Sequence, residues 1–126
     1  MAHEAILIVD DNLVNLKLTR VVLSMAGYDV RVATQGVDAL KILETFHPQL
    51  ILMDIQLPGM DGLELTRKIK ADPKTRDPII LALTAYAMKG DEERAIKAGC
   101  DGYITKPIDT RTFPDTIQTF IKRRTG

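Results

Sequence analysis

Three carboxylates in this chain follow short apolar runs, at places where side chains can hold a metal ion. Asp10 and Asp11 come directly after the apolar run 5–9, and Asp54 comes directly after the run 50–53. If the fold brings these carboxylates together they repel one another, and a folded protein keeps such an arrangement when a cation compensates the charge. Oxygen ligands on a partly open site suit Mg²⁺, which takes one or two carboxylates together with a phosphate. The residue types therefore predict a Mg²⁺ site that can receive a phosphoryl group.

Other apolar runs end in residues that complete this chemistry. Thr84 follows the run 79–83, and Lys106 lies two residues after the run 102–104. A lysine supplies a positive charge for phosphate, and a threonine hydroxyl supplies a donor for one of its oxygens. An acceptor carboxylate, a metal, a cation and positioning donors are the parts that phosphoryl transfer needs. Taken singly, an Asp pair after a strand is often a turn with a helix cap, so the prediction depends on the whole set.

The elements that must position these side chains are predicted by apolar periodicity. Five short runs rich in Ile, Leu and Val predict strands, and their continuity indicates burial on both faces; the runs are 5–9, 29–33, 50–53, 79–83 and 102–104. Segments between them have helical spacing and predict amphipathic helices with one core face each. The predicted core faces are Val14, Leu18, Val21, Val22 and Met25; then Val37, Leu40 and Leu43; then Phe113, Ile117, Phe120 and Ile121.

Alternation of buried strands with helices predicts an α/β doubly wound fold, with parallel strands joined by right-handed crossover helices. We expect one domain over residues 1–126, with five helices and a five-stranded parallel sheet in the flavodoxin-like order 2-1-3-4-5. The functional crevice of such a sheet lies outside the carboxyl ends of the strands, where the strand order reverses. Strands one and three are neighbours there, so Asp10, Asp11 and Asp54 should converge. Gly27 should end the first helix, and Thr112 should cap the last one, with Pro114 in its first turn.

Four segments carry a family resemblance: LIVDDN (residues 7–12), LILMDIQLPGMDGLE (50–64), LALTAYAM (81–88) and GYITKPI (102–108). Their order and spacing resemble the receiver domain of bacterial two-component response regulators, and the match covers nearly the whole chain. The stretch AMKGDEERAIKAGCDGYITKPI further resembles single-domain members of that family that regulate cell division. A receiver segment of a hybrid histidine kinase has a very similar sequence and is kept as an alternative.

The resemblance implies a role for each candidate residue. Asp54 would be the phosphoacceptor, and Asp10, Asp11, Asp54 and the backbone carbonyl of Gln56 would hold Mg²⁺. Lys106 would hold a phosphoryl oxygen, Thr84 would be the switch hydroxyl, and Tyr103 would be the aromatic whose rotamer follows it. Tyr86 and Gln56 would flank the phosphoryl group at positions that influence how long it lasts.

Composition limits the partners. The chain has 17 basic and 17 acidic residues, so it has no overall charge with which to attract nucleic acid or an anionic membrane. No apolar run approaches the ~20 residues of a membrane span, and the amino terminus does not read as a signal peptide, so we expect a cytoplasmic protein. The resemblance implies that its partners are a sensor histidine kinase or histidine phosphotransfer protein and a downstream effector protein. We expect a monomer or weak dimer.

Two other functions would use the same fold. An Asp-nucleophile phosphatase would share the acceptor, the metal and the lysine, but it generally needs a second carboxylate two residues after the nucleophile, where this chain has Gln56. A flavin or nucleotide module would need a phosphate-cradling loop after the first strand, where this chain has Asp10 and Asp11. We therefore expect a switch and not an enzyme. Its signal should leave through the face formed by the fourth helix, the fifth strand and the fifth helix, about residues 89–122.

Overall fold

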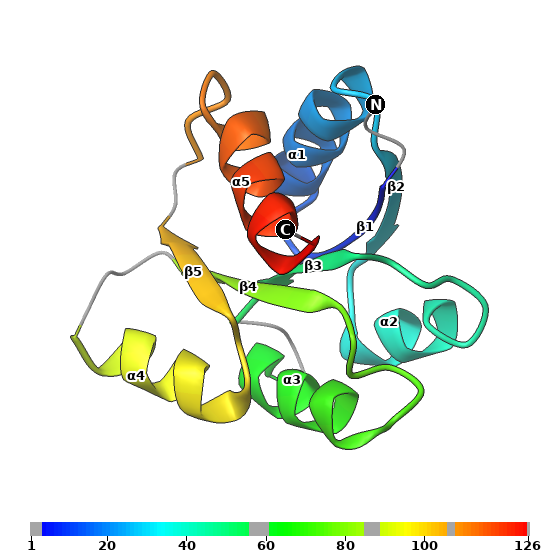
Figure 1. Cartoon of the computed structure of the whole chain (residues 1–126), viewed down its shortest axis with the longest axis vertical. Coiled ribbons are helices and arrows are strands. Elements are labelled where there is room, and N and C mark those ends of the chain that lie inside the picture. The colour runs from blue at the N-terminus through cyan, green and yellow to red at the C-terminus, as the bar shows by residue number, and fades with distance from the viewer. Residues whose placement is uncertain (1–3, 56–60, 85–88, 106–107, 126) are drawn as a thin grey trace.

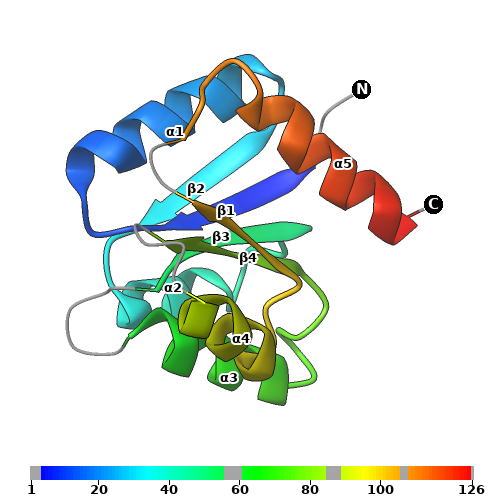
Figure 2. The ribbon, with the colours of Figure 1, turned by 90° about the vertical axis from the view of Figure 1, so that its left-hand side faces the viewer.

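Five parallel strands form one sheet in the order β2-β1-β3-β4-β5 in the computed structural model, which describes residues 4–55, 61–84, 89–105 and 108–125. The strands are β1 (Ala5–Val9), β2 (Asp29–Ala33), β3 (Leu50–Asp54), β4 (Ile79–Thr84) and β5 (Gly102–Thr105). The helices are α1 (Leu13–Met25), α2 (Gly36–Ile42), α3 (Gly62–Ala71), α4 (Lys89–Ala98) and α5 (Phe113–Thr125). Figures 1 and 2 show α1 and α5 on one face of the sheet, and α2, α3 and α4 on the other. The predicted fold class and strand order are confirmed.

The core consists of two layers because neighbouring residues of a strand point to opposite faces. Leu52 of β3 packs in one layer and Met53 packs in the other, and every residue of β3 and β4 is buried. The prediction of burial on both faces was wrong for β2 and β5, in which exposed residues alternate with partly buried ones and only Ala33, at the end of β2, is buried. These two strands form the edges of the sheet, so each has a neighbouring strand on one side only.

The first helix places its core face differently from the prediction. Its buried residues are Leu16, Thr19 and Leu23. The residues predicted to face the core are largely exposed: Val14 at 77%, Leu18 at 45%, Val21 at 41% and Met25 at 84%. Only Val22 of the predicted set packs against the core. The prediction of a helix was right, but the prediction of which face packs against the sheet was wrong. This helix has apolar residues on two opposite faces, so either face could have been the buried one.

Capping interactions fix the ends of α1. The Asn12 side chain accepts hydrogen bonds from the backbone N–H groups of Val14 and Asn15, each at 3.1 Å. At the other end Gly27 has a φ of 98°, a left-handed conformation that favours glycine, and its N–H donates to the Ser24 carbonyl. Gly27 therefore ends the helix as predicted.

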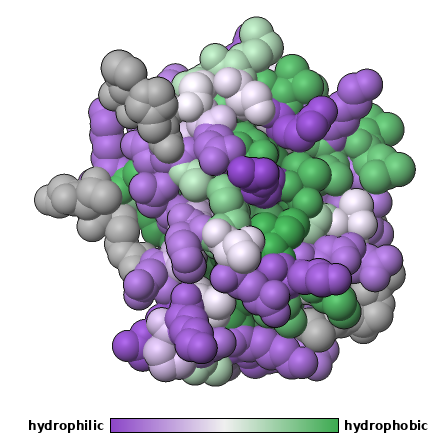
Figure 3. Space-filling view, turned by 90° about the vertical axis from the view of Figure 1, so that its right-hand side faces the viewer, coloured by the Kyte–Doolittle hydropathy of each residue, from purple (hydrophilic) through white to green (hydrophobic). Residues whose placement is uncertain are grey.

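Figure 3, which views the molecule from the side of β2, shows hydrophobic side chains gathered on the surface.

The last helix follows its prediction. Phe113, Ile117 and Ile121 are buried, and α5 begins at Phe113 with Pro114 as its second residue. In α2 the prediction holds in part, because Val37 is exposed at 65%. None of the helices in the described part of the chain has both the length and the apolar character needed to cross a membrane.

Candidate metal and phosphoryl site

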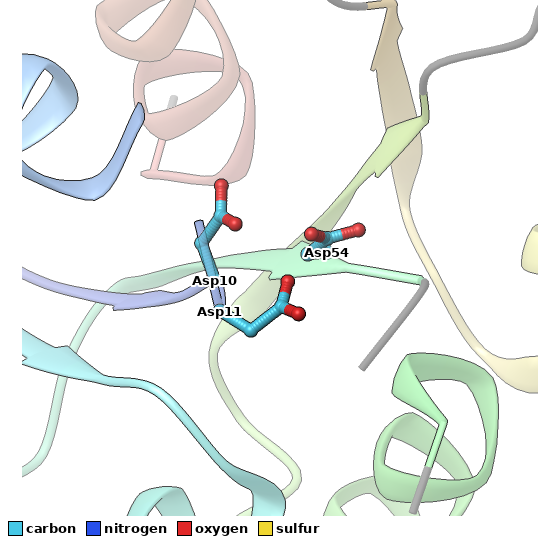
Figure 4. Close-up of side chains that lie close together, drawn as sticks. All are labelled: Asp10, Asp11 and Asp54. Carbon is cyan, nitrogen blue, oxygen red and sulfur yellow. The ribbon is translucent and has the colours of Figure 1, made fainter. Parts of the chain in front are cut away.

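The three candidate carboxylates lie at the carboxyl ends of two neighbouring strands. Val9 and Met53 are partners in the parallel register of β1 and β3, so the residues that follow them leave the sheet side by side. Asp10, Asp11 and Asp54 each offer a carboxylate oxygen that lies within 4.8 Å of the others. Figure 4 shows the three side chains gathered at these strand ends. The strand order thus brings Asp54 next to Asp11 and Asp10, which precede it by 43 and 44 positions in the sequence.

The turn after β1 fixes Asp10 and leaves Asp11 accessible. The backbone N–H of Asp10 donates to the Ala33 carbonyl of β2 at 3.1 Å, and its carboxylate accepts from the Asn12 N–H at 2.9 Å. Asp10 is 1% exposed and Asp54 is 5% exposed, whereas Asp11 lies on the surface. The cluster therefore has two buried members and one member in contact with solvent.

The donor set suits a hard cation. All three ligand candidates are carboxylates, and within the described residues no other group of three or more His, Cys, Asp or Glu side chains lies close enough together to hold a metal ion. Two buried carboxylates beside a third one repel each other unless a positive charge lies among them. Oxygen donors with an open side match Mg²⁺, which keeps several waters and leaves room for a phosphate. The residues present thus fit this ion.

The backbone that follows Asp54 is held on two sides. Asp54 ends β3 and pairs with Leu83 of β4, and the next N–H, that of Ile55, donates to the Leu83 carbonyl at 3.2 Å. On the other side the carbonyl of Ile55 accepts from the N–H of Gly62, the first residue of α3, at 3.2 Å. Gly62 lies within the motif LILMDIQLPGMDGLE, but its contact with the strand end did not follow from the sequence.

Of the remaining candidate residues, the structure describes two, Thr84 and Tyr103. Thr84 ends β4 and is buried at 5% exposure, at the same end of the sheet as Asp54. Tyr103 lies on the edge strand β5, 36% exposed, and pairs with Ala82. Gln56, Tyr86 and Lys106 lie outside the described residues.

Comparison with known proteins identifies relatives along almost the whole chain. The model of the response regulator receiver domain matches residues 6–118. The polar-differentiation response regulator DivK of Brucella ovis is 44% identical over 118 residues, which cover 94% of this chain and 96% of that protein. The protein of the same name from Brucella anthropi is 43% identical with the same coverage.

Solved structures agree with this family. A putative response regulator from Chloroflexus aurantiacus superimposes with a TM-score of 0.90 at 30% identity, over 96% of this chain and 99% of that one. The receiver domain of a sensor histidine kinase from Pseudomonas aeruginosa superimposes with a TM-score of 0.86 at 36% identity, with the same coverage. That crystal structure holds a magnesium ion coordinated in the active site cleft.

Proposed function

Because this chain belongs to the response regulator receiver domain family and is similar to DivK, we propose that it is a switch that accepts a phosphoryl group on Asp54 with Mg²⁺. The family implies interaction with histidine kinases or phosphotransfer proteins. The observation that carries the proposal is the convergence of Asp10, Asp11 and Asp54, whose carboxylate oxygens lie within 4.8 Å of one another. The magnesium ion in the related Pseudomonas receiver domain supports the choice of metal.

In the proposed reaction a carboxylate oxygen of Asp54 attacks the phosphorus of a phosphohistidine on the partner. A P–O bond forms, the P–N bond of the donor breaks, and the imidazole leaves, so that Asp54 becomes an acyl phosphate. The ligands of Mg²⁺ would be Asp10, Asp11, Asp54 and the carbonyl of Gln56. The ion would neutralise charge on the phosphoryl oxygens. Lys106 would hold one of those oxygens through a charge-assisted hydrogen bond.

The product stays attached to the protein and acts as a signal, so the chain serves as a switch and not as an enzyme. The position two residues after the acceptor is Gln56, which cannot act as the second carboxylate that an Asp-nucleophile phosphatase uses. We propose that the acyl phosphate is read by a downstream effector protein in the cytoplasm, through the face of α4, β5 and α5. Tyr103 and Ile96 are exposed on this face and give a partner apolar surface to contact.

A labelling experiment tests the acceptor and the metal together. The purified protein is incubated with labelled acetyl phosphate, with and without Mg²⁺, and the bound label is followed over time. Asp54→Asn should abolish labelling, because an amide is not a competent nucleophile. Asp38→Asn, on the exposed side of α2, is the matched control and should label as the wild type does. Substantial label on the Asp54→Asn protein would refute the assignment.

A further inference from the structure

The first turn of α3 contacts the backbone of Asp54 more closely than any side chain allows. A Cβ atom built on Gly62 would overlap the carbonyl oxygen of Asp54, and it would lie 2.9 Å from the carbonyl carbon and 2.7 Å from the Cα of Ile55. Real Cβ atoms essentially never come within 3.0 Å of such atoms. All of these neighbours are backbone, so no side-chain rotation relieves the overlap.

The reason for glycine at this position is space. Among the described residues, Gly27 and Gly99 are the glycines with a positive φ, so Gly62 has a backbone conformation that alanine also adopts. Alanine is moreover the better helix former, and helix propensity alone would favour it at the start of α3. The packing against Asp54 therefore decides the residue type.

The first turn of α3 is itself held firmly. The Asp61 carboxylate accepts from the Glu64 N–H at 2.8 Å, and the Thr66 hydroxyl donates to the Gly62 carbonyl at 2.8 Å. Thr66 is fully buried, so this turn cannot shift without disturbing the core. Ile55, the residue after the acceptor, is thus held on both sides: its N–H donates to Leu83 of β4, and its carbonyl accepts from Gly62 at the start of α3.

We propose that Gly62 is a positioning residue for the acceptor. Its bare Cα lets α3 seat against the Asp54–Ile55 peptide, and this contact fixes the direction in which the Asp54 carboxylate leaves the sheet. The inference rests on the proposed function, because the orientation matters only if Asp54 receives the phosphoryl group. A displacement of the acceptor by about 1 Å is enough to slow a positioned reaction by on the order of 100-fold.

Gly62→Ala tests the proposal, with Gly102→Ala as the matched control. A Cβ at Gly102 would crowd the Phe120 ring at 3.0 Å and the Leu81 side chain at 3.2 Å, which are flexible groups in the core beneath α5. Both variants add one methyl group at a closely packed position, but only Gly62 lies next to the acceptor Asp54. The labelling rate is measured with saturating Mg²⁺ and acetyl phosphate, and the folded fraction of each variant is checked by thermal melting.

We expect Gly62→Ala to label about tenfold to 100-fold more slowly per folded molecule, and Gly102→Ala to label at the wild-type rate. A folded Gly62→Ala protein with a wild-type rate overturns the inference. If the wild type takes no label, the proposed function fails instead, so the two failures are distinguishable. Equal slowing of both variants also overturns the inference, because it would reflect a general loss of structure.

If Gly62→Ala does not fold, amide hydrogen exchange in the wild-type protein tests the proposal instead. The Gly62 N–H donates to the carbonyl of Ile55, and Mg²⁺ bound at the carboxylates should hold that peptide more firmly. Exchange at Gly62 should therefore slow when Mg²⁺ is added. Exchange of the Gly99 N–H, which donates to Ile96 at the end of α4, should stay the same. Unchanged exchange at Gly62 under saturating Mg²⁺ overturns the inference.

Discussion

Asp11 is the exposed member of a cluster whose other two carboxylates are buried. Without a cation, the three carboxylates repel one another, so Asp11→Asn should preserve or raise the melting temperature of the metal-free protein. The same substitution should weaken Mg²⁺ binding. Asn12, and not Asp11, caps α1, so no cap is lost. Thermal melting with and without Mg²⁺, together with a Mg²⁺ titration, checks both effects. A clear loss of metal-free stability with unchanged Mg²⁺ affinity would mean that Asp11 has a structural role.

Cys100 gives a second test at the scale of one residue. It is buried, its sulfur lies 3.9 Å from the Thr66 hydroxyl, and burial raises the pKa of the thiol above its ordinary value. A raised pKa means that the fold favours the neutral thiol. Its contribution to stability is therefore complete below the pKa of the unfolded chain, and it is lost as the pH rises through the higher folded pKa.

The free energy of unfolding should accordingly fall more steeply above the ordinary thiol pKa in the wild type than in Cys100→Ala. Urea unfolding of both proteins across this alkaline range measures the difference. Tyr28, whose pKa is also raised by burial, titrates in both proteins, so it does not affect the comparison. Parallel curves would contradict the prediction.

At the scale of elements, α1 offers the sharpest test of orientation. Leu23 is fully buried and Met25 is 84% exposed, although both belong to the same helix. Leu23→Ala should cost about 2–5 kcal/mol of unfolding free energy, because it leaves a cavity. Met25→Ala should change that free energy by no more than about 0.5 kcal/mol, as exposed substitutions usually do. Urea denaturation compares the two variants. Equal losses would show that Met25 also packs in the core.

The same helix shows why part of the structure could not be predicted. The central strands β3 and β4 were predictable because they are buried on both faces and therefore have continuous apolar runs. Helix α1 has apolar residues on opposite faces, so spacing could not say which face meets the sheet. Thr19 takes a core position because its hydroxyl donates to the Asn15 carbonyl within the helix, which satisfies a buried polar group.

The convergence of Asp10, Asp11 and Asp54 was predictable once the strands and their order had been predicted. Residues that follow neighbouring parallel strands must meet at one edge of the sheet, so the strand order alone places them together. The contact of Gly62 with the Asp54 backbone could not be predicted in this way. It depends on the distance between α3 and β3, which is set by the packing of the whole molecule.

For the whole molecule, the question is how a charge added at one end of the sheet reaches a partner. Thr84 is buried at the end of β4, beside the strand that carries Asp54, and Tyr103 lies two positions from the end of the neighbouring strand β5. A phosphoryl group adds negative charge and strong acceptors, so a hydroxyl such as that of Thr84 can move toward it. In the proposed switch, the space that it leaves would let Tyr103 turn. A partner that prefers the turned state would then bind more tightly, and its binding would in turn favour phosphorylation.

Thr84→Ala and Tyr103→Ala should therefore still accept label on Asp54, since neither variant changes the acceptor. Both should lose most of the gain in partner affinity that phosphorylation produces, a coupling that is typically on the order of 5- to 150-fold. Thr45→Ala, at an exposed position after α2, is the control and should keep the full gain. Titration of each protein against the histidine kinase or the downstream partner, with and without a phosphoryl mimic, measures the coupling. If both variants keep the full gain, the signal does not pass through Thr84 and Tyr103, and the partner reads another surface. If only Thr84→Ala loses the gain in partner affinity, the coupling depends on the Thr84 hydroxyl and not on the Tyr103 ring. Tyr103 would then follow the change without transmitting it to the partner.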